Sequence, residues 1–580
     1  MISWTLLALL LTVPTFDVVE AVDSDGSDSS DAMDSSDEND NMCPKVYHKG
    51  TLALNWNPAF LHVDEYSDGE GLTISSFFNV ARNPSPIGPP VFPFERDLVA
   101  RIPNLDNLDI ANFDVNLDLE ELTDTSLPPG QQPEIVWPNE SVRAPSNMFH
   151  GIVDAVVIPQ GFLSTQRPGR LTAVDITTGT EYIIHQSTLQ VGVPPTFPIP
   201  DPENSPRFYH RALFIDIDGD NALDIVTVRS GFLPGQVVHP PKGELVWFKN
   251  PGTALDPNIP WEETVLFGGI QVDFLGPDIH LASYDFENDG VPEIIATHFF
   301  SAFAPMGPPG PGSPPIQNGK ITIYGTPQGQ DWSQVDQFST LRQKDISVDQ
   351  GFPFEIEIVD LNRDGKVDIL ATNHQPDQCS QTTSNPTLGK VYAYEQPTSG
   401  NIFDETEDWI LHVLLDDIKP QPSLLPARPP GRLAPGAAQS FYPLRAMEKQ
   451  NGNGANNHRP WIVVGGDEAG KVWILEPTNN QKASWEYKVS VIFDINDFYG
   501  ENATQTPLDD PFGITISTIG AIAVRYDRSG NAGRAELYIP VFEAKDIHVF
   551  SFRTPTGGGG IFEHQIYCTE DTTLACPSSS

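Results

Sequence analysis

The sequence predicts an all-β fold, a seven-bladed β-propeller with calcium-binding loops, preceded by a signal peptide and a disordered acidic tail. Three observations predict the propeller. A strand-rich segment recurs seven times at intervals of about 70 to 90 residues, a second strand marker follows most copies, and helical periodicity is nearly absent. Repeats of this length, each unable to bury its own faces, imply four-stranded blades arranged around an axis.

Each clear copy runs from an apolar residue and an aspartate through a short polar loop into a β-rich strand. The five clear copies are VDEYSDGEGLTISSFF from Val63, IDIDGDNALDIVTV from Ile215, YDFENDGVPEIIATHF from Tyr284, VDLNRDGKVDILATNH from Val359 and YDRSGNAGRAELYIPVF from Tyr526. Two weaker copies begin at Ser146 and Met447. The second marker is a turn feeding an alternating apolar strand, as in GELVWFKNP from Gly243.

The two ends of the chain differ from the repeats. Residues 1–21 begin with MISWTLLALLLTVPTF, an apolar run shorter than the ~20 residues of a membrane-spanning helix, and small residues precede a cleavage point near Ala21. We interpret this segment as a signal peptide, with an uncleaved signal anchor as the alternative. Residues 22–42 are rich in Ser and Asp and predict a disordered acidic segment. The propeller is expected over 43–556, with a Gly- and Cys-containing tail over 557–580.

Other features of the sequence are consistent with secretion to the extracellular space. Asn139 and Asn502 begin glycosylation acceptor triplets, which predict a glycoprotein. Four cysteines, Cys43, Cys379, Cys568 and Cys576, allow three full disulfide pairings, and the spacing does not choose between them. A disulfide that holds the C-terminal tail, or joins the two ends, is favoured over a metal cluster, whose ligands would lie close together.

The net charge is strongly negative. The chain carries 78 acidic and 33 basic side chains, for a formal charge of −45 at pH 7. Nucleic acid is therefore excluded as a partner, because phosphate binding requires a basic surface. The charge favours cations or a partner with a basic surface. No segment after the first 21 residues is long and apolar enough to span a membrane.

Three of the polar loops carry acidic or amide side chains at positions 1, 3, 5 and 9. These candidate metal ligands are Asp216, Asp218, Asp220 and Asp224; Asp285, Glu287, Asp289 and Glu293; and Asp360, Asn362, Asp364 and Asp368. Carboxylates so close together repel one another unless a cation lies between them, and oxygen ligands of this number suit Ca²⁺. The runs after the loops are short and β-rich, and position 12 is not acidic, so the loops join strands and are not EF-hands.

This pattern resembles the FG-GAP or VCBS repeat family, the propeller of integrin alpha headpieces and of many secreted proteins. The resemblance covers about Asn55 to Phe552 and implies that calcium is structural, fixing the turn between the first two strands of a blade. The Phe-Gly and Gly-Ala-Pro signatures of the family are not evident, and the Ser146 copy keeps only Asp154. The loops at Asp64 and Asp527 keep part of the ligand set, so the sequence leaves open whether they bind metal.

Polar residues at the ends of the second strands are expected on the opposite rim. These residues are Gln160, Arg229, His298, His374, Asp467 and Glu543, joined there by His210 and His280. His298, His374 and Arg229 are the candidates for acid–base catalysis. The resemblance allows such chemistry, because some relatives of this fold act on polysaccharides.

Two functions follow from these features. The favoured one is a secreted calcium-binding propeller for extracellular recognition or adhesion, with a protein, glycan or mineral surface as partner. The alternative is a secreted carbohydrate-active enzyme, a polysaccharide lyase or hydrolase, that uses the His, Arg and acidic residues of the rim.

Overall fold

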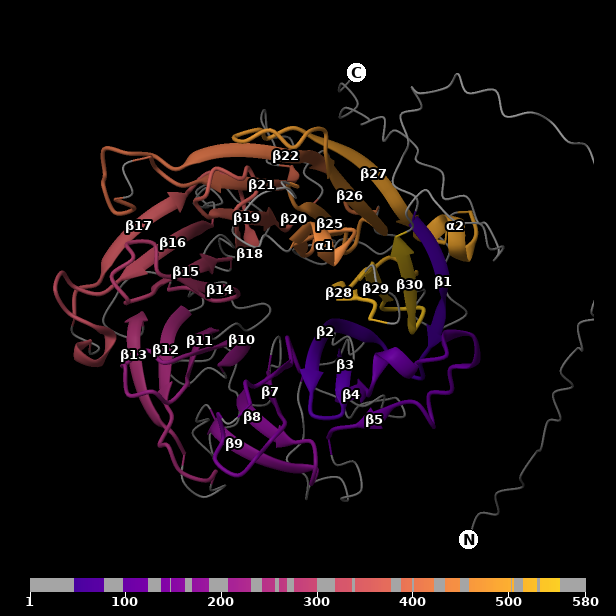
Figure 1. Cartoon of the computed structure of the whole chain (residues 1–580), viewed down its shortest axis with the longest axis horizontal. Helices are drawn as coiled ribbons and strands as arrows, with labels where there is room; N and C mark the ends of the chain where they lie inside the picture. Colours follow the sequence, from indigo (N-terminus) through magenta and orange to yellow (C-terminus); the bar gives the residue numbers. More distant parts are fainter. Residues whose placement is uncertain are drawn as a thin grey trace, which may run out of the picture. The chain divides into compact units, whose positions relative to one another are not determined.

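Seven four-stranded antiparallel sheets form a ring in the computed structural model (Figure 1), which confirms the predicted seven-bladed β-propeller. The structure describes residues 46–77, 97–123, 137–146, 148–161, 169–186, 207–230, 243–255, 260–268, 276–299, 319–335, 339–376, 388–398, 401–421, 433–448, 458–501, 503–504, 515–528 and 533–552. Each of the seven sequence copies corresponds to one blade. We number the blades by the order of their inner strands.

The strands of each blade run from the axis outward. Blade 1 contains β2 (Pro58–Tyr66), β3 (Gly69–Ser76), β4 (Leu98–Ile102) and β5 (Glu120–Glu121), and blade 2 contains β6 (Val142–Arg143), β7 (Ala155–Pro159), β8 (Arg170–Asp175) and β9 (Thr180–Gln186). Blade 3 contains β10 (Phe208–Ile215), β11 (Asp224–Ser230), β12 (Gly243–Lys249) and β13 (Glu262–Gly268), and blade 4 contains β14 (Leu281–Tyr284), β15 (Glu293–His298), β16 (Lys320–Gly325) and β17 (Arg342–Ser347). Blade 5 contains β18 (Pro353–Val359), β19 (Asp368–Asn373), β21 (Gly389–Glu395) and β22 (Ile410–Ile418), and blade 6 contains β24 (Ala438–Phe441), β25 (Trp461–Gly465), β26 (Lys471–Pro477) and β27 (Tyr487–Asp494).

Blade 7 closes the ring with strands from both ends of the described chain. It contains β28 (Ala523–Tyr526), β29 (Ala535–Val541), β30 (Asp546–Phe552) and, as its outer strand, β1 (Val46–Ala53). β1 pairs antiparallel with β30, and Leu52 lies opposite Ile547. The sequence repeats did not predict this closure, because β1 precedes the first recognisable copy.

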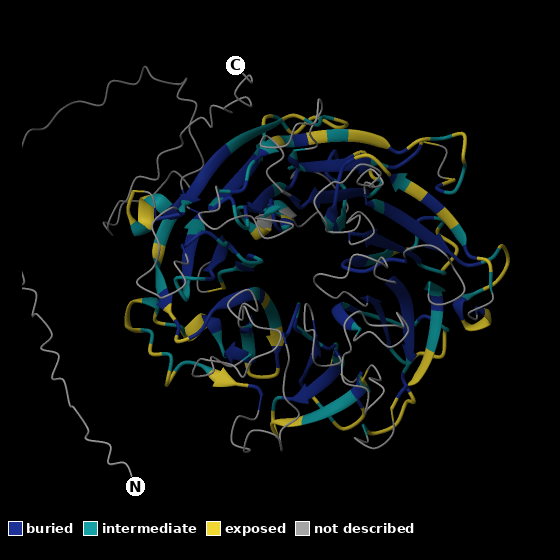
Figure 2. Ribbon diagram, turned by 180° about the vertical axis from the view of Figure 1, so that it is seen from behind, coloured by how far each residue is buried: buried dark blue, intermediate teal, exposed yellow. Residues whose placement is uncertain are grey.

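Burial follows the position of a strand within its blade. The second strands β11, β15, β19 and β29 are buried along their whole length, because both of their faces pack against neighbouring blades. Most residues of outer strands such as β13 and β22 are exposed or half-buried (Figure 2). This difference explains why the second strands are nearly continuous apolar runs while the outer strands also contain polar residues.

Short elements complete the described fold. They are the 3₁₀ turns η2 (Leu105–Asn107), η3 (Ile110–Asn112) and η6 (Trp332–Gln334), the helices α1 (Arg445–Glu448) and α2 (Ile495–Tyr499), and a small ladder of β20 (Gln375–Pro376) with β23 (Leu433–Ala434). Within the part of the chain that the structure describes, no helix is long and apolar enough to cross a membrane. The predicted signal peptide, the acidic segment 22–42, the tail 557–580 and all four cysteines lie outside the described residues.

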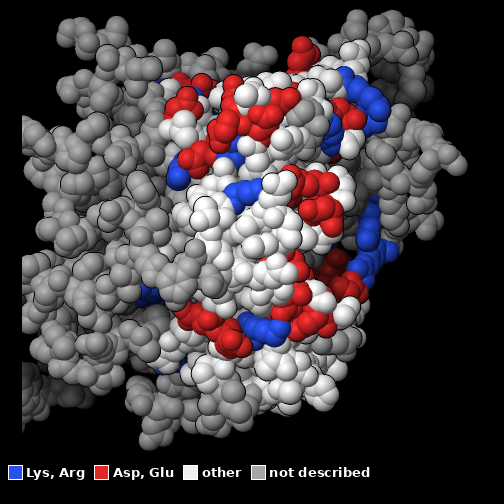
Figure 3. Space-filling view, turned by 90° about the vertical axis from the view of Figure 1, so that its left-hand side faces the viewer, with Lys and Arg blue, Asp and Glu red and all other residues white. Residues whose placement is uncertain are grey.

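Acidic side chains form several patches on the outer surface. Figure 3 views the molecule from the left-hand side of Figure 1, where blades 3 and 4 lie, and shows these patches with fewer basic side chains between them. The distribution agrees with the negative charge of the whole chain.

Replacing Leu52 by alanine tests the closing strand. Leu52 is fully buried in the cluster shared by β1, β30 and blade 1, so its truncation should lower the free energy of unfolding by about 2–5 kcal/mol. Chemical denaturation measures this change. Leu117→Ala is the matched control, because Leu117 is 82% exposed and its truncation should cost less than about 0.5 kcal/mol. Equal effects of the two substitutions would contradict closure by β1.

Candidate functional site

The three acidic loops join the inner strand of a blade to its second strand, as predicted. Loop A (216–224) connects β10 to β11 in blade 3, loop B (285–293) connects β14 to β15 in blade 4, and loop C (360–368) connects β18 to β19 in blade 5. Since each loop makes the same connection, from the inner to the second strand of its blade, the three loops lie on the same face of the ring.

All three loops have the same backbone turn. Residues 4 and 6 of each loop adopt a positive φ; these are Gly219 and Asn221 in loop A, Asn288 and Gly290 in loop B, and Arg363 and Gly365 in loop C. A positive φ is unfavourable for most side chains and easy for glycine and, to a lesser extent, asparagine. The repetition of this conformation in three different sequences indicates that it serves a shared purpose.

Backbone hydrogen bonds orient the first carboxylate of each loop in the same way. One oxygen of Asp216 accepts from Asn221 N at 2.9 Å. The equivalent oxygens of Asp285 and Asp360 accept from Gly290 N at 2.9 Å and Gly365 N at 3.1 Å. The fifth residue also accepts from the seventh in each loop, at 2.8–2.9 Å. These bonds give the carboxylates at positions 1 and 5 the same orientation in all three loops.

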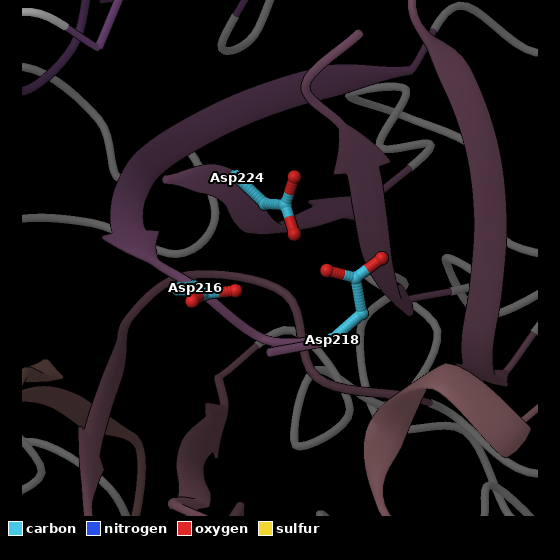
Figure 4. A group of neighbouring side chains, drawn as sticks. All are labelled: Asp216, Asp218 and Asp224. Atoms are coloured by element: carbon cyan, nitrogen blue, oxygen red, sulfur yellow. The ribbon is translucent and has the colours of Figure 1, made fainter. Parts of the chain in front are cut away.

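Buried carboxylate oxygens in loops A and C lack hydrogen-bond partners among the described residues. They are Asp216 Oδ1, Asp224 Oδ2, Asp360 Oδ1 and Asp368 Oδ1. In loop A, oxygens of Asp216, Asp218 and Asp224 lie within 4.8 Å of one another, and Figure 4 shows the three carboxylates around a common space. An all-oxygen set at this spacing fits Ca²⁺, whose ligands lie 2.3–2.6 Å from the ion.

The ninth residue of each loop is an unusually weak acid. Burial, reinforced by neighbouring carboxylates, raises the pKa of Asp224 to about 6, of Glu293 to about 7 and of Asp368 to about 8. A bound divalent cation would reverse this effect, because it favours the ionised carboxylates. Without a counter-charge, burial therefore favours the neutral form of these three acids.

Basic side chains already contact two of the loops. Lys249 Nζ contacts Asp218 and lies 3.1 Å from Asp220 in loop A. Arg342 lies 2.7 Å from Glu287 and 3.9 Å from Glu293 in loop B. Both basic side chains are about one-third exposed to solvent.

The acidic residues of the partial loop at Asp64 have partners within the protein. Asp64 lies inside β2, and the connection to β3 is a tight hairpin turn. Asp68 pairs with Arg101, and Glu70 pairs with Arg525 at 2.7 Å. The acidic residues of blade 1 are therefore neutralised by arginines, a change that the linear spacing did not reveal.

Arginine also neutralises the acidic residues of blades 2 and 7. Arg143 Nε donates to Asp154 at 2.9 Å, and Asp154 also accepts from Ser67 N at 3.0 Å. In blade 7, Glu536 pairs with Lys49 and with Arg525, the latter at 3.1 Å. Asn531 of the Asp527 loop lies outside the described residues.

The rim candidates for catalysis do not form one site. His298 Nε2 is 2.8 Å from the Tyr324 hydroxyl in its own blade. Arg229 pairs with Glu244 and Glu263 in its own blade, at 2.7 and 2.6 Å. Each of these side chains is thus held by partners on neighbouring strands, because it points into the sheet packing and not toward the axis.

His374 does meet another rim residue. Its Nδ1 is 2.8 Å from the Pro435 carbonyl oxygen, so Nδ1 carries the proton and Nε2 faces Asp467 Oδ2 at 3.6 Å. Burial lowers the pKa of His374 to about 4, so the imidazole is neutral near pH 7, and burial raises the pKa of Asp467 well above its usual range.

His210 and His280 converge near the axis, where the sequence did not predict a distinct site. Glu140 Oε1 lies 3.8 Å from His210 Nδ1 and 3.9 Å from His280 Nε2. Glu140 Oε2 accepts from Arg211 at 2.7 Å, and Glu355 lies 3.9 Å from His280 Nε2. We call Glu140, His210, Arg211, His280 and Glu355 the axial cluster. Only the two histidines were expected on this rim.

The two glycosylation acceptors have different outcomes. Asn139 is fully buried, and its Nδ2 donates to the Tyr209 carbonyl oxygen at 2.6 Å. A glycan cannot be accommodated on this nitrogen in the folded protein, so the expectation for Asn139 is wrong. Asn502 lies outside the described residues.

Comparison with known proteins gives only distant similarities. No family model matches the chain, and no curated protein sequence matches it. An oligogalacturonate lyase in complex with manganese is similar with a TM-score of 0.33 and 10% identity, covering 87% of this chain and 99% of that chain. A puromycin-hydrolysing peptidase of Mycobacterium tuberculosis has a TM-score of 0.29 and 10% identity, covering 85% and 62%. Both similarities are too distant to assign a family or an activity.

Removing Arg143 tests whether arginine takes the place of a cation in blade 2. Arg143→Ala leaves Asp154 buried without its counter-charge and should lower the free energy of unfolding by about 3–5 kcal/mol, whether or not calcium is present. The double variant Arg143→Ala/Asp154→Ala should recover much of this loss, because it removes the isolated charge. Chemical denaturation measures both, and a loss below about 1 kcal/mol in the single variant would contradict the assignment.

Proposed function

We propose that this protein is a secreted calcium-binding β-propeller, of the FG-GAP or VCBS type, that acts in extracellular recognition. One observation carries the proposal: three consecutive blades repeat the same turn, and loops A and C hold buried carboxylate oxygens without partners. A solvated acidic turn would need neither this burial nor this uniform geometry. The donor set of oxygens favours calcium over softer metals.

Calcium would serve a structural role in this proposal. Loops A, B and C lie between the inner and second strands, so an ion in each would fix the hairpin next to the axis. The residues that would hold it are those at positions 1, 3, 5 and 9, with the carbonyl of position 7 as a further oxygen donor. The ion would remove the carboxylate repulsion and so stabilise the folded chain.

Recognition is supported by surface charge and by the expected signal peptide. The acidic patches and the net charge of −45 suit a protein, glycan or mineral surface that presents cations. The alternative enzyme on the rim has no comparable support, because His298 and Arg229 are bound within separate blades.

Thermal and chemical unfolding with calcium and with a chelator test the proposal. Calcium at about one hundredfold its Kd should stabilise the fold by about 2.7 kcal/mol for each site. Asp224→Asn and Asp368→Asn should each abolish the calcium-dependent stabilisation that comes from one site. Their stability in chelator should change little, because burial already favours the neutral side chain.

Asp408→Asn is the matched control for these variants. Asp408 is exposed and lies outside the loops, so this variant should respond to calcium as the unmodified protein does. Unfolding that is unaffected by calcium in the unmodified protein would contradict the proposal. Equal calcium responses of Asp408→Asn and Asp368→Asn would rule out loop C as a site.

A further inference from the structure

Irregular pairing near the axis creates the axial cluster. Register shifts at the start of the inner strands leave Ala59 unpaired in β2, His210 and Arg211 in β10, and Phe354 and Glu355 in β18. β-bulges redirect side chains and are common beside functional sites. Here the shifted positions include His210, Arg211 and Glu355, three members of the axial cluster.

The side chains from separate blades meet around Arg211. Its guanidinium donates to Glu140 of blade 2 and contacts His280 Nε2 of blade 4. Glu355 of blade 5 lies 3.9 Å from the same His280 nitrogen. About 30% of the Arg211 side chain and 20% of the Glu355 side chain remain exposed, so solvent reaches the cluster.

Two groups of the cluster lack hydrogen-bond partners among the described residues. Arginine only donates, so His280 Nε2 must accept from Arg211, and the proton of the neutral ring lies on Nδ1. Nδ1 is buried without a partner, in a side chain that is 1% exposed. The Glu355 carboxyl makes no hydrogen bond at all within the described chain. Unmet polar groups of this kind destabilise a fold unless a ligand satisfies them.

The cluster is close to neutral overall. The charge of Glu140 is balanced by Arg211. Burial and the nearby Glu140 raise the pKa of Glu355 well above its usual range, and burial lowers the pKa of His210 to about 4 and that of His280 further below its usual value. Glu357 of the same strand is held separately, because it accepts from the backbone and hydroxyl of Ser440 at 2.7 and 2.6 Å.

Aromatic rings from opposite blades border the cluster. Phe60 of blade 1 and Phe354 of blade 5 lie 5.7 and 6.2 Å from the His210 ring, both edge to face. Apolar ring surface next to neutral donors and acceptors suits a ligand with C–H faces and several hydroxyls.

A metal ion is a poor fit for this cluster. Among the described residues, the one group that brings ligand atoms of three His, Cys, Asp or Glu side chains within 4.8 Å of one another is in loop A. The positive guanidinium of Arg211 also lies between the potential ligands, where it would repel a cation.

We propose that the axial cluster binds a neutral polyhydroxylated ligand, an uncharged sugar unit of a glycan, with Glu355 and Arg211 as its main hydrogen-bonding groups. This inference rests on the proposed recognition function and names a ligand class for it. Glu355 acts as a neutral carboxylic acid that donates to a ligand hydroxyl, and Arg211 donates to the ligand oxygens.

The test uses the full mature chain in calcium on an array of neutral oligosaccharides of glucose, galactose, mannose, xylose and N-acetylglucosamine. Sulfated and uronic-acid glycans and lysine-rich peptides are included on the same array. The unmodified protein should bind at least one neutral oligosaccharide. Glu355→Ala should weaken this binding by about tenfold or more, the loss expected for one strong hydrogen bond. Glu355→Gln should stay within about threefold, because glutamine resembles the protonated acid.

Glu405→Ala is the matched control, since Glu405 is 82% exposed, and it should bind as the unmodified protein does. Glu355→Ala should also melt at the same or a higher temperature, because it removes a mostly buried carboxyl group that makes no hydrogen bond with the described chain. The inference would be overturned if the unmodified protein bound no neutral oligosaccharide, or if Glu355→Ala bound as well as the unmodified protein. A lower melting temperature of Glu355→Ala would also overturn it. So would binding to charged probes alone, with that binding lost in Glu355→Gln. Failure of calcium binding would appear in the unfolding experiments and not in this comparison of variants in calcium.

Discussion

Carboxylates at or near the first hairpin of most blades set the main electrostatic constraint on this fold. The hairpins lie next to the axis, where packing between blades removes much of the water that would otherwise screen the charges. Blades 1, 2 and 7 meet the constraint with arginine: Arg101 and Arg525 neutralise blade 1, Arg143 neutralises blade 2, and Arg525 also reaches Glu536 of blade 7. Blades 3, 4 and 5 instead keep three loops whose geometry suits a cation. The two solutions divide the ring into an arginine-bridged half and a half that we propose is calcium-bound.

The arginine-bridged half is also where the ring closes. β1 joins the described start of the chain to β30, and Arg525 links blades 1 and 7 through Glu70 and Glu536. At the closure, the counter-charges of these acids are therefore side chains of the protein itself. Loss of an ion from blades 3 to 5 would then loosen hairpins within continuous chain without opening the ring. The axial cluster draws on both halves, because Glu140 comes from blade 2 and Glu355 from blade 5.

The sequence predicted the blade number and the three loops because both depend on local patterns. A period of about 70 to 90 residues and alternate acids within nine residues are visible without any tertiary contact. It did not predict closure by β1, whose partner lies about 500 residues away. It left open the role of Asp64 and misjudged Asn139, because the contacts of Asp64 and Asp68 with Arg143 and Arg101, and the buried environment of Asn139, come from pairing between distant segments. His298 and Arg229 were placed at the correct end of their strands, but the sequence could not show that Tyr324 and Glu263 hold them within their blades. The bulges that expose Arg211 and Glu355 to the axis leave no mark on the spacing of the repeats.

The most direct test of this account is a count of bound metal ions by native mass spectrometry of the mature protein. The account predicts a species with three calcium ions per chain, converted to the ion-free mass by a chelator. It also predicts that magnesium does not replace calcium at equal concentration, because the loops offer many flexible oxygen ligands and Mg²⁺ requires strict octahedral geometry. A chain that carries no calcium at millimolar concentration would contradict the account, and the acids of loops A, B and C would then need another role.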